Sequence, residues 1–284
     1  MAQILSGKDV AAAMKERLSA DVADLKAKGV RPTLAILRVG EKGDQIAYER
    51  GATKRCEGIG VGVRSMTLAE EATQVELLAA IRTLNDDEGV HGVLLLSPLP
   101  AHLNLKEAAA ALDPEKDVDS ATASSLARVF AGEGAGFAPC TAQACLEILR
   151  HYDIAVEGKH VGVLGRSLVI GRPVALMLMH EHATPTICHS RSVDAHLITR
   201  TCDIVIVAVG RGESIGASYF SEGQVVIDVG TNWNAEAGKL TGDVRFDEVE
   251  PLVGAITPVP GGVGAVTTSV LAQHVIQAAR RRLG

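Results

Sequence analysis

The fold follows from one segment, HVGVLGRSLVIGRP, at residues 160–173. Its first five residues have the character of a short strand, Gly165 and Gly171 bound a turn, and Pro173 is typical of the first turn of a helix. Glycines let a backbone approach a pyrophosphate, and the free N–H groups of a helix N-terminus favour an anion. The segment therefore predicts a nucleotide-binding βα turn. Its spacing is GxSxxxG rather than GxGxxG, so an ordinary glycine-rich βα connection stays open at this point.

Short β-branched runs alternate with helical periods on both sides of this segment, as in parallel sheets with crossover helices. We expect strands at residues 33–38, 61–66, 92–96, 160–164, 184–188, 204–209 and 225–229, and helices at 9–28, 44–58, 74–84, 141–152, 173–179 and 263–282. A looser acidic and glycine-rich stretch spans 113–138. We predict two α/β domains, one of residues 1–138 with the closing helix 263–284, and a Rossmann-like one of residues 139–262.

The composition is that of a soluble globular protein. The 284 residues are 47% hydrophobic and 22% charged, with 28 basic against 34 acidic side chains and a net charge of −6. No apolar run reaches the roughly 18–20 residues that span a bilayer, and the start MAQILSGKDV lacks the plan of a signal peptide. The acidic balance argues against a protein that neutralises nucleic-acid phosphates. We expect a cytoplasmic protein with free cysteines, no metal site, and neither a membrane nor a nucleic acid as partner.

The end of the next strand indicates which dinucleotide is bound. In NAD-preferring sites that strand usually ends in a carboxylate that binds the ribose 2′-hydroxyl. Here it ends in Cys188-His189-Ser190-Arg191-Ser192, with no carboxylate. Ser190, Arg191 and the turn residue Arg166 can instead face a 2′-phosphate, so NADP is favoured over NAD. A solvated cation at a helix start is the alternative interpretation of Arg191.

Several phrases, in order, resemble those of the methylenetetrahydrofolate dehydrogenase/cyclohydrolase family. The second half contains GRSLVIGRP, CHSRS, VIDVGTN, GDVRF and ITPVPGGVG, and the first half contains Tyr48 with a downstream KRCEGIGV, then SPLPAHL and PEKDVDS. The resemblance covers nearly the whole chain. It implies two α/β domains with a cleft between them, a folate-binding N-terminal part, an NADP-binding C-terminal part and a homodimer.

The resemblance also implies roles for individual residues. The expected cofactor-binding residues are Gly165, Arg166, Ser167, Gly171, Ser190, Arg191 and Thr231, the last on the nicotinamide side. The expected catalytic residues are Tyr48, which positions or stacks on the folate, and Asp119, which binds the amino-pyrimidine edge of the pterin. A loop-capping role is the alternative for Asp119. The substrate-binding set adds Ala52, Leu96, Pro260, Gly261 and Gly262.

Two positions depart from the family pattern. The family carries Tyr-x-x-x-Lys on its catalytic helix, and its lysine is tied to the cyclohydrolase proton transfers, but the residue four after Tyr48 is Ala52. The family also has a glutamine two residues before the first proline of the SPLP loop, where this chain has Leu96. A leucine offers none of the donors and acceptors of a glutamine. We therefore expect the cyclohydrolase apparatus to be dismantled.

Three functions are compatible with these observations. The first is an NADP-dependent methylenetetrahydrofolate dehydrogenase whose cyclohydrolase activity is lost or weak. The second is a dehydrogenase of the same fold that acts on another one-carbon carrier or small substrate, because the segment SATASS at residues 120–125 departs from the family's run. The third is a non-catalytic NADP-binding regulatory protein, for which the missing lysine and glutamine are the evidence.

Overall fold

The computed structural model describes residues 1–283, and the chain divides into two compact units, each described here by itself. The C-terminal unit holds residues 1–12 and 141–267, and the N-terminal unit holds residues 13–140 and the chain from Thr268 onward. The structure groups residues 1–12 with the C-terminal unit, whereas the sequence analysis placed them in the first domain. Strand β1 (Gln3–Ile4) pairs in parallel with β11 (Ala255–Ile256), so the start of the chain extends the sheet of the C-terminal unit.

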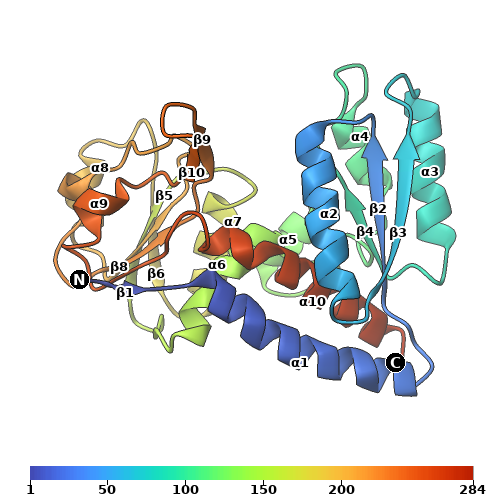
Figure 1. The fold of residues 1–284 in the computed structure, drawn as a ribbon, viewed down its shortest axis with the longest axis horizontal. Helices are drawn as coiled ribbons and strands as arrows, with labels where there is room; N and C mark the ends of the chain where they lie inside the picture. The colour runs from blue at the N-terminus through green and yellow to red at the C-terminus, as the bar shows by residue number, and fades with distance from the viewer. Residues whose placement is uncertain (284) are drawn as a thin grey trace. The chain divides into compact units, whose positions relative to one another are not determined.

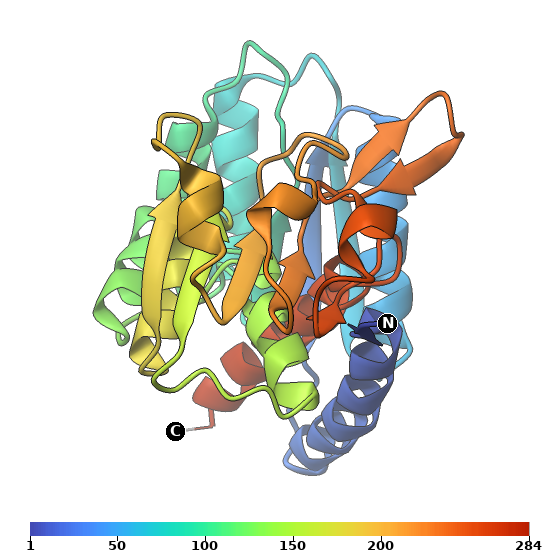
Figure 2. The ribbon, with the colours of Figure 1, turned by 90° about the vertical axis from the view of Figure 1, so that its left-hand side faces the viewer.

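The C-terminal unit contains a six-stranded sheet in the order β1-β11-β8-β7-β5-β6, and every adjacent pair is parallel (Figure 2). Its central strands are β5 (His160–Leu164), β6 (Thr184–Cys188), β7 (Ile204–Val207) and β8 (Val225–Asp228). The chain runs from β5 to β6 on one side and then crosses to β7 on the other. This reversal creates a topological switch point at the carboxyl ends of β5 and β7, where open α/β sheets bind ligands.

Helices and short elements complete this unit. Its α-helices are α6 (Cys140–His151), α7 (Gly171–His180), α8 (Ala195–Thr199) and α9 (Phe246–Val249). The segments η1 (Ala217–Tyr219) and η2 (Val263–Ala265) are 3₁₀ turns, and β9 (Asn232–Asn234) with β10 (Lys239–Thr241) forms an antiparallel hairpin. The core includes Val205, Val207, Val226 and Ile256, all fully buried. Such β-branched runs suit parallel strands covered on both faces.

The N-terminal unit is built on a parallel sheet in the order β3-β2-β4, with α2 and α3 flanking the strands (Figure 1). The strands are β2 (Thr33–Val39), β3 (Gly62–Leu68) and β4 (Gly92–Leu95). The helices are α1 (Gly7–Ala27), α2 (Gly43–Glu57), α3 (Gln74–Asp86), α4 (Leu105–Ala111), α5 (Ala123–Ala131) and α10 (Thr267–Arg281). Residues 7–12, at the start of α1, belong to the C-terminal unit. Ala35 and Leu37 of β2 pack with Leu77 and Ile81 of α3 in the core.

The sequence located the longer elements to within a few residues but was wrong about the stretch 113–138, which contains α5. Thr122 caps this helix by accepting the Ser125 N–H, and Gly132 ends it in the left-handed conformation. The closing helix begins at Thr267 rather than 263, after the 3₁₀ turn η2. The short elements β1, α4, α8, β9, β10, α9 and β11 had no counterpart in the sequence prediction.

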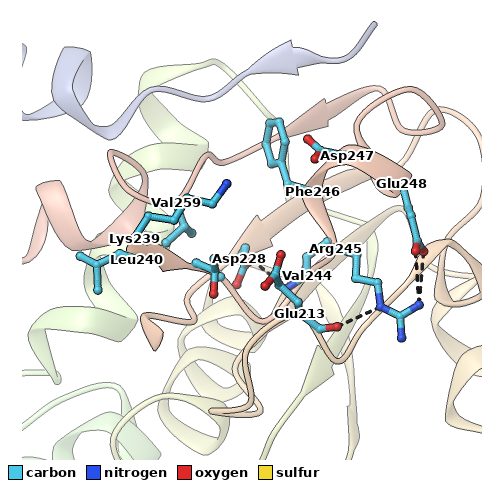
Figure 3. Close-up of a pocket in the computed structure, with 12 residues that line it drawn as sticks. Glu213, Asp228, Lys239, Leu240, Val244, Arg245, Phe246, Asp247, Glu248 and Val259 are labelled. Atoms are coloured by element: carbon cyan, nitrogen blue, oxygen red, sulfur yellow. Dashed lines mark hydrogen bonds and ion pairs between the residues drawn. The ribbon is translucent and has the colours of Figure 1, made fainter. Parts of the chain in front are cut away.

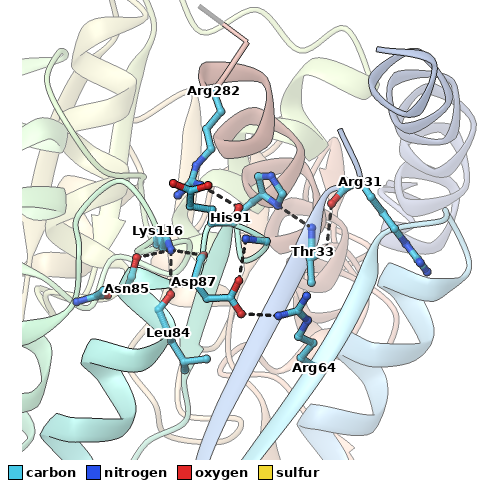
Figure 4. A network of polar contacts seen from close by, with 11 residues as sticks. Arg31, Thr33, Arg64, Leu84, Asn85, Asp87, His91, Lys116 and Arg282 are labelled. Atoms are coloured by element: carbon cyan, nitrogen blue, oxygen red, sulfur yellow. Dashed lines mark hydrogen bonds and ion pairs between the residues drawn. The ribbon is translucent and has the colours of Figure 1, made fainter. Parts of the chain in front are cut away.

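A buried lysine closes the end of α3. Lys116, 1% exposed, donates from Nζ to the carbonyl oxygens of Leu84, Asn85 and Asp87 at 2.9, 2.5 and 2.8 Å (Figure 4). Carbonyls at a helix C-terminus lack partners within the helix and carry partial negative charge, so an ammonium group satisfies them well. Burial lowers the pKa of Lys116. We read this lysine as structural.

No helix among the described residues is long and apolar enough to cross a membrane.

Candidate active site

A cavity of about 480 Å³ lies at the carboxyl ends of β5, β6 and β7 in the C-terminal unit. Its lining comprises residues 164–167, 188–190, 195, 208, 209, 211, 214, 215 and 219. The expected cofactor residues Gly165, Arg166, Ser167 and Ser190 are all in this lining. The structure therefore brings the glycine-rich turn and the end of the next strand to one cavity at the switch point.

Two glycines allow the turn after β5 to approach its neighbours. Gly165 has φ +127°, and a Cβ there would lie 2.2 Å from the carbonyl oxygen of Ala208, just beyond β7. A Cβ on Gly171 would lie 2.2 Å from the carbonyl oxygen of Gly165. Ser167 Oγ accepts the Ile170 N–H at 3.2 Å and holds the turn in shape. Both glycines are therefore required for backbone packing, whether or not a ligand is bound.

The charges that line the cavity suit a polyanion. The guanidinium groups of Arg166 and Arg211 have no hydrogen-bond partner among the described residues, and no carboxylate is among the lining residues. The hydroxyl groups of Ser167 and Ser190 add neutral donors, whereas the Ser214 hydroxyl already donates to the carbonyl of Arg211 at 2.8 Å. Paired guanidiniums and hydroxyls are the usual partners of phosphate oxygens.

Arg191 and Thr231 do not line this cavity. Arg191 is exposed, and its backbone N–H donates to His189 Nδ1 at 3.1 Å, while Thr231 is exposed beyond the end of β8. The second cation of the cavity is instead Arg211, which the sequence analysis missed. Arg211 follows β7 as Ser190 follows β6, so the rule that ligands sit at the carboxyl ends of parallel strands provided a signal for it.

One buried carboxylate organises the loop that carries Arg211. Asp243, 0% exposed, accepts the backbone N–H groups of Val209, Gly210 and Arg211 at 2.7, 2.8 and 2.8 Å. It also accepts the Asn232 side-chain amide at 3.0 Å. Two oxygens thus hold four donors from the segments after β7 and β8. Charge-assisted bonds of this kind are among the stronger ones in proteins.

Asp228, at the end of β8, accepts backbone N–H groups of Gly230, Asp243 and Val244 at 2.9 to 3.1 Å. Burial raises its pKa to about 6 against the opposing effect of these bonds. A second cavity of about 310 Å³ adjoins it (Figure 3). There Arg245 bonds to the carbonyl of Glu213 and to the carboxylate of Glu248. The lining carries four carboxylates, those of Glu213, Asp228, Asp247 and Glu248, against the two cations Lys239 and Arg245. Because its carboxylates outnumber its cations, this second cavity suits a polyanion less well than the first.

The expected catalytic pair lies together in the N-terminal unit. Tyr48 on α2 and Asp119 are close enough that the Asp119 charge helps burial to raise the tyrosine pKa. Asp119 Oδ1 accepts the Cys140 N–H at 3.3 Å, and burial raises the pKa of this carboxyl to about 6. The Tyr48 hydroxyl therefore stays protonated at neutral pH and acts as a hydrogen-bond donor rather than a base.

Buried Asp117 shapes the loop beside Asp119. Its carboxylate accepts the backbone N–H groups of Ala121 and Thr122 at 2.8 Å each and the Ser125 hydroxyl at 2.6 Å. Ser120, which lies between Asp119 and the start of α5, has a φ of +60°. The unusual segment 120–125 is thus an ordered helix entry.

The two departures from the family pattern are both buried and apolar. Ala52 is 0% exposed and lies four residues after Tyr48 on α2, so the two positions share a helix face. Leu96 is 5% exposed, and its N–H donates to the carbonyl of Leu37 as a continuation of β4. No described polar group replaces the family's lysine and glutamine at these two positions.

The loop of Pro260, Gly261 and Gly262 belongs to the C-terminal unit, whereas Tyr48, Ala52, Leu96 and Asp119 belong to the N-terminal unit. This loop supports the start of α1, because the Gly7 N–H donates to the Gly261 carbonyl at 2.8 Å. A Cβ on Gly7 would lie 1.9 Å from the Gly262 carbonyl oxygen. Among residues 1–283 there is no cluster of three or more histidine, cysteine, aspartate or glutamate side chains that could hold a metal ion.

Two domain families match this chain. Residues 5–119 match the catalytic domain of tetrahydrofolate dehydrogenase/cyclohydrolase, and residues 139–283 match the NAD(P)-binding domain of the same family. The chain belongs to the tetrahydrofolate dehydrogenase/cyclohydrolase family. The expectations of this family and of a two-domain α/β fold with a Rossmann-like C-terminal part are confirmed.

Individual relatives of this family cover nearly the whole chain. The bifunctional protein FolD of Carboxydothermus hydrogenoformans is 49% identical over 98% of this chain and 97% of its own length. The bifunctional protein FolD of Clostridioides difficile is 45% identical over 98% of this chain and 96% of its own length. Among solved structures, bifunctional FolD from Campylobacter jejuni superposes with a TM-score of 0.95 at 38% identity, covering 99% of this chain and 100% of its own. The Trypanosoma brucei enzyme, complexed with NADP and an inhibitor, gives 0.91 at 34%, covering 99% and 98%.

Proposed function

We propose that this family member is an NADP-dependent 5,10-methylenetetrahydrofolate dehydrogenase whose cyclohydrolase activity is lost or weak. The observation that best supports this proposal is the cavity at the switch point. There Arg166 and Arg211 present unpaired guanidiniums, and no carboxylate is among the lining residues. NADP has one phosphate more than NAD, so this lining favours it. A structural neighbour from Trypanosoma brucei is complexed with NADP, in support of the same cofactor.

The residues present fit this dinucleotide. Gly165 and Gly171 let the turn after β5 take the close-packed shape that lines the cavity, and Ser167 and Ser190 offer hydroxyls there. The bound dinucleotide would supply the acceptor for the hydride that leaves the methylene bridge of the folate. The chain contributes binding and orientation, because hydride transfer depends on alignment more than on acid–base groups.

On the substrate side, Asp119 binds the amino-pyrimidine edge of the pterin as a two-oxygen acceptor, and Tyr48 positions the ring. Neither role requires a proton to move. Hydrolysis of the methenyl product does require proton transfers, and Ala52 and Leu96 provide no group that can carry them. The relatives are described as bifunctional, so the loss proposed here rests on these two positions of this chain.

The deciding experiment assays the purified chain with 5,10-methylenetetrahydrofolate and either NADP or NAD, and then with 5,10-methenyltetrahydrofolate alone. We expect NADP reduction, and methenyl hydrolysis no faster than in buffer. Hydrolysis at the rate of a bifunctional relative would contradict the role given to Ala52 and Leu96. NADP binding without binding of any folate would instead favour a different substrate, and folate binding without turnover would favour a regulatory protein.

The family resemblance adds two further proposals. We propose that the chain forms a homodimer, which light scattering on the purified protein tests, and that it acts in the cytoplasm, which imaging of a fluorescent fusion tests. Neither is needed for the assignment of the cofactor cavity.

A further inference from the structure

Gln45 on α2 has a buried acceptor without a partner. Its side chain is 4% exposed, and Nε2 donates to the carbonyl oxygen of Pro98 at 2.9 Å. Its Oε1 is shielded from solvent and has no hydrogen-bond partner among the described residues. A buried acceptor left unpaired destabilises the folded chain, so such an atom requires an explanation.

The orientation of this amide is fixed by chemistry. A carbonyl oxygen can only accept, so the nitrogen of Gln45 must face Pro98 and the oxygen must face away from it. Exchanging the two atoms would remove the bond and place two acceptors against each other. The free atom is therefore an acceptor, and its missing partner is an N–H or O–H donor.

The acceptor lies on the face of α2 that carries the proposed substrate residues. Gln45, Tyr48, Ala52 and Cys56 are spaced three, four and four residues apart, so they form one stripe along the helix. Asp119, whose charge acts on Tyr48, is followed by Ser120, and the Ser120 hydroxyl is a second buried atom without a partner. Unsatisfied polar atoms thus occur on both sides of the Tyr48–Asp119 pair.

A third such atom, Ser269 Oγ on α10, has a simpler explanation. A serine within a helix can rotate its hydroxyl toward a carbonyl of the preceding turn without any ligand. Gln45 has no such freedom because its amide is tied to Pro98.

We propose that Gln45 is a substrate-binding residue, in which Oε1 accepts an N–H of the tetrahydropterin ring while Nε2 stays bonded to Pro98. This proposal rests on the proposed function, because it takes a tetrahydrofolate as the ligand. The fixed amide distinguishes donors from acceptors at this point of the ring, next to the carboxylate that binds the amino-pyrimidine edge.

Two substitutions distinguish the role of the Oε1 acceptor from that of the hydrogen bond between Nε2 and Pro98, which anchors the side chain. Q45M keeps the volume and removes both bonds, whereas Q45K can still donate to Pro98 but has no acceptor. The matched control is Q74M, because the Gln74 amide exchanges both of its bonds with the backbone of Asn104 and has no orphaned atom. Melting temperatures and the Kd for NADP identify any variant that fails to fold.

The measurements are the KM for 5,10-methylenetetrahydrofolate and the calorimetric Kd for tetrahydrofolate. We expect both constants to rise about tenfold in Q45M and in Q45K, with the Kd for NADP and the behaviour of Q74M unchanged. Wild-type constants in Q45K would show that only the anchor matters, and wild-type constants in both variants would show that Gln45 is not used. Either result overturns this proposal, whereas a wild-type chain that binds no tetrahydrofolate overturns the proposed function instead.

A truncated ligand tests the assignment to the ring. In competition experiments, 6-methyltetrahydropterin, which lacks the benzoylglutamate tail, should lose affinity in Q45M by the same factor as tetrahydrofolate. A loss confined to tetrahydrofolate would place the donor in the tail and overturn the ring assignment.

Discussion

The carboxylate of Asp243 accepts the backbone N–H of Arg211 at 2.8 Å, across 32 residues of sequence. Arg211 lines the cofactor cavity, whereas Asp243 does not. The aspartate therefore acts on the cavity only through the backbone of the loop after β7, which makes it a positioning residue.

Replacing Asp243 by asparagine should weaken NADP binding about tenfold or more while leaving tetrahydrofolate binding unchanged. Asparagine has only one oxygen to accept the three backbone N–H groups of residues 209–211. Its NH₂ group would face the N–H groups that lose their acceptor, so the loop cannot keep its shape. Kd values for both ligands measure this. The control is D247N, which makes the same change on an exposed carboxylate four residues away. Equal effects on the two ligands would indicate a general loss of stability rather than positioning.

Replacing Gly165 by alanine should abolish NADP binding and lower the free energy of unfolding by about 2–3 kcal/mol. The added Cβ would lie 2.2 Å from the Ala208 carbonyl oxygen at a φ of +127°. Urea unfolding and NADP titration provide the measurement. Gly158 offers a matched control, because its φ is also positive but a Cβ there meets no atom within 4 Å. If G158A lowers the free energy of unfolding as much as G165A does, the close approach of the turn to the residue after β7 is not the cause of the destabilisation.

Replacing Asp119 by asparagine should stabilise the protein at pH 7 by roughly 1–3 kcal/mol, although it removes folate binding. Burial raises the folded-state pKa of Asp119 from 3.8 to about 6, so the folded chain holds more protons than the unfolded chain between these values. Stability therefore falls as pH rises through this window, and the neutral asparagine avoids the loss. Urea unfolding at pH 7 and at pH 3.5 tests this, because the advantage should vanish at the lower pH.

Asp228 provides the contrast for this prediction. Its pKa is also raised to about 6, but its two oxygens accept three backbone N–H groups, whereas Asp119 accepts one from Cys140. D228N should therefore destabilise the protein at pH 7. A stabilised D228N would show that burial of charge outweighs these bonds.

Restoring the polar pair should restore cyclohydrolase activity. The double variant A52K/L96Q carries both polar residues of the family pattern, whereas either single variant introduces one buried polar group without the other, at a cost of about 1–3 kcal/mol if that group stays unpaired. We expect methenyl hydrolysis above the buffer rate in the double variant, with NADP-dependent dehydrogenase activity retained in all three. The hydrolysis is followed by absorbance. An inactive but folded double variant would show that other substituted positions, such as those in 120–125, also block the reaction.

The sequence alone determined the features that depend on local rules. The βα turn at Gly165 and Gly171 needs residues without a side chain, and such a requirement is visible in the residue types themselves. The longer strands and helices have clear periodicity, and the absence of a lysine at Ala52 and of a glutamine at Leu96 is a matter of spacing from Tyr48 and from the SPLP loop.

Only the tertiary structure decided which distant residues serve one place. Arg211 rather than Arg191 lines the cavity, because the loop after β7 is held by a carboxylate that follows β10. Strand β1 joins the sheet of the C-terminal unit through pairing across more than 250 residues, and two residues carry too little pattern to reveal this. The unpaired oxygen of Gln45 is likewise invisible in sequence, since it arises only when Pro98 occupies the amide nitrogen. Local conformational preferences follow from residues that are neighbours in sequence. Whether a buried polar group finds a hydrogen-bond partner depends on how the whole chain packs.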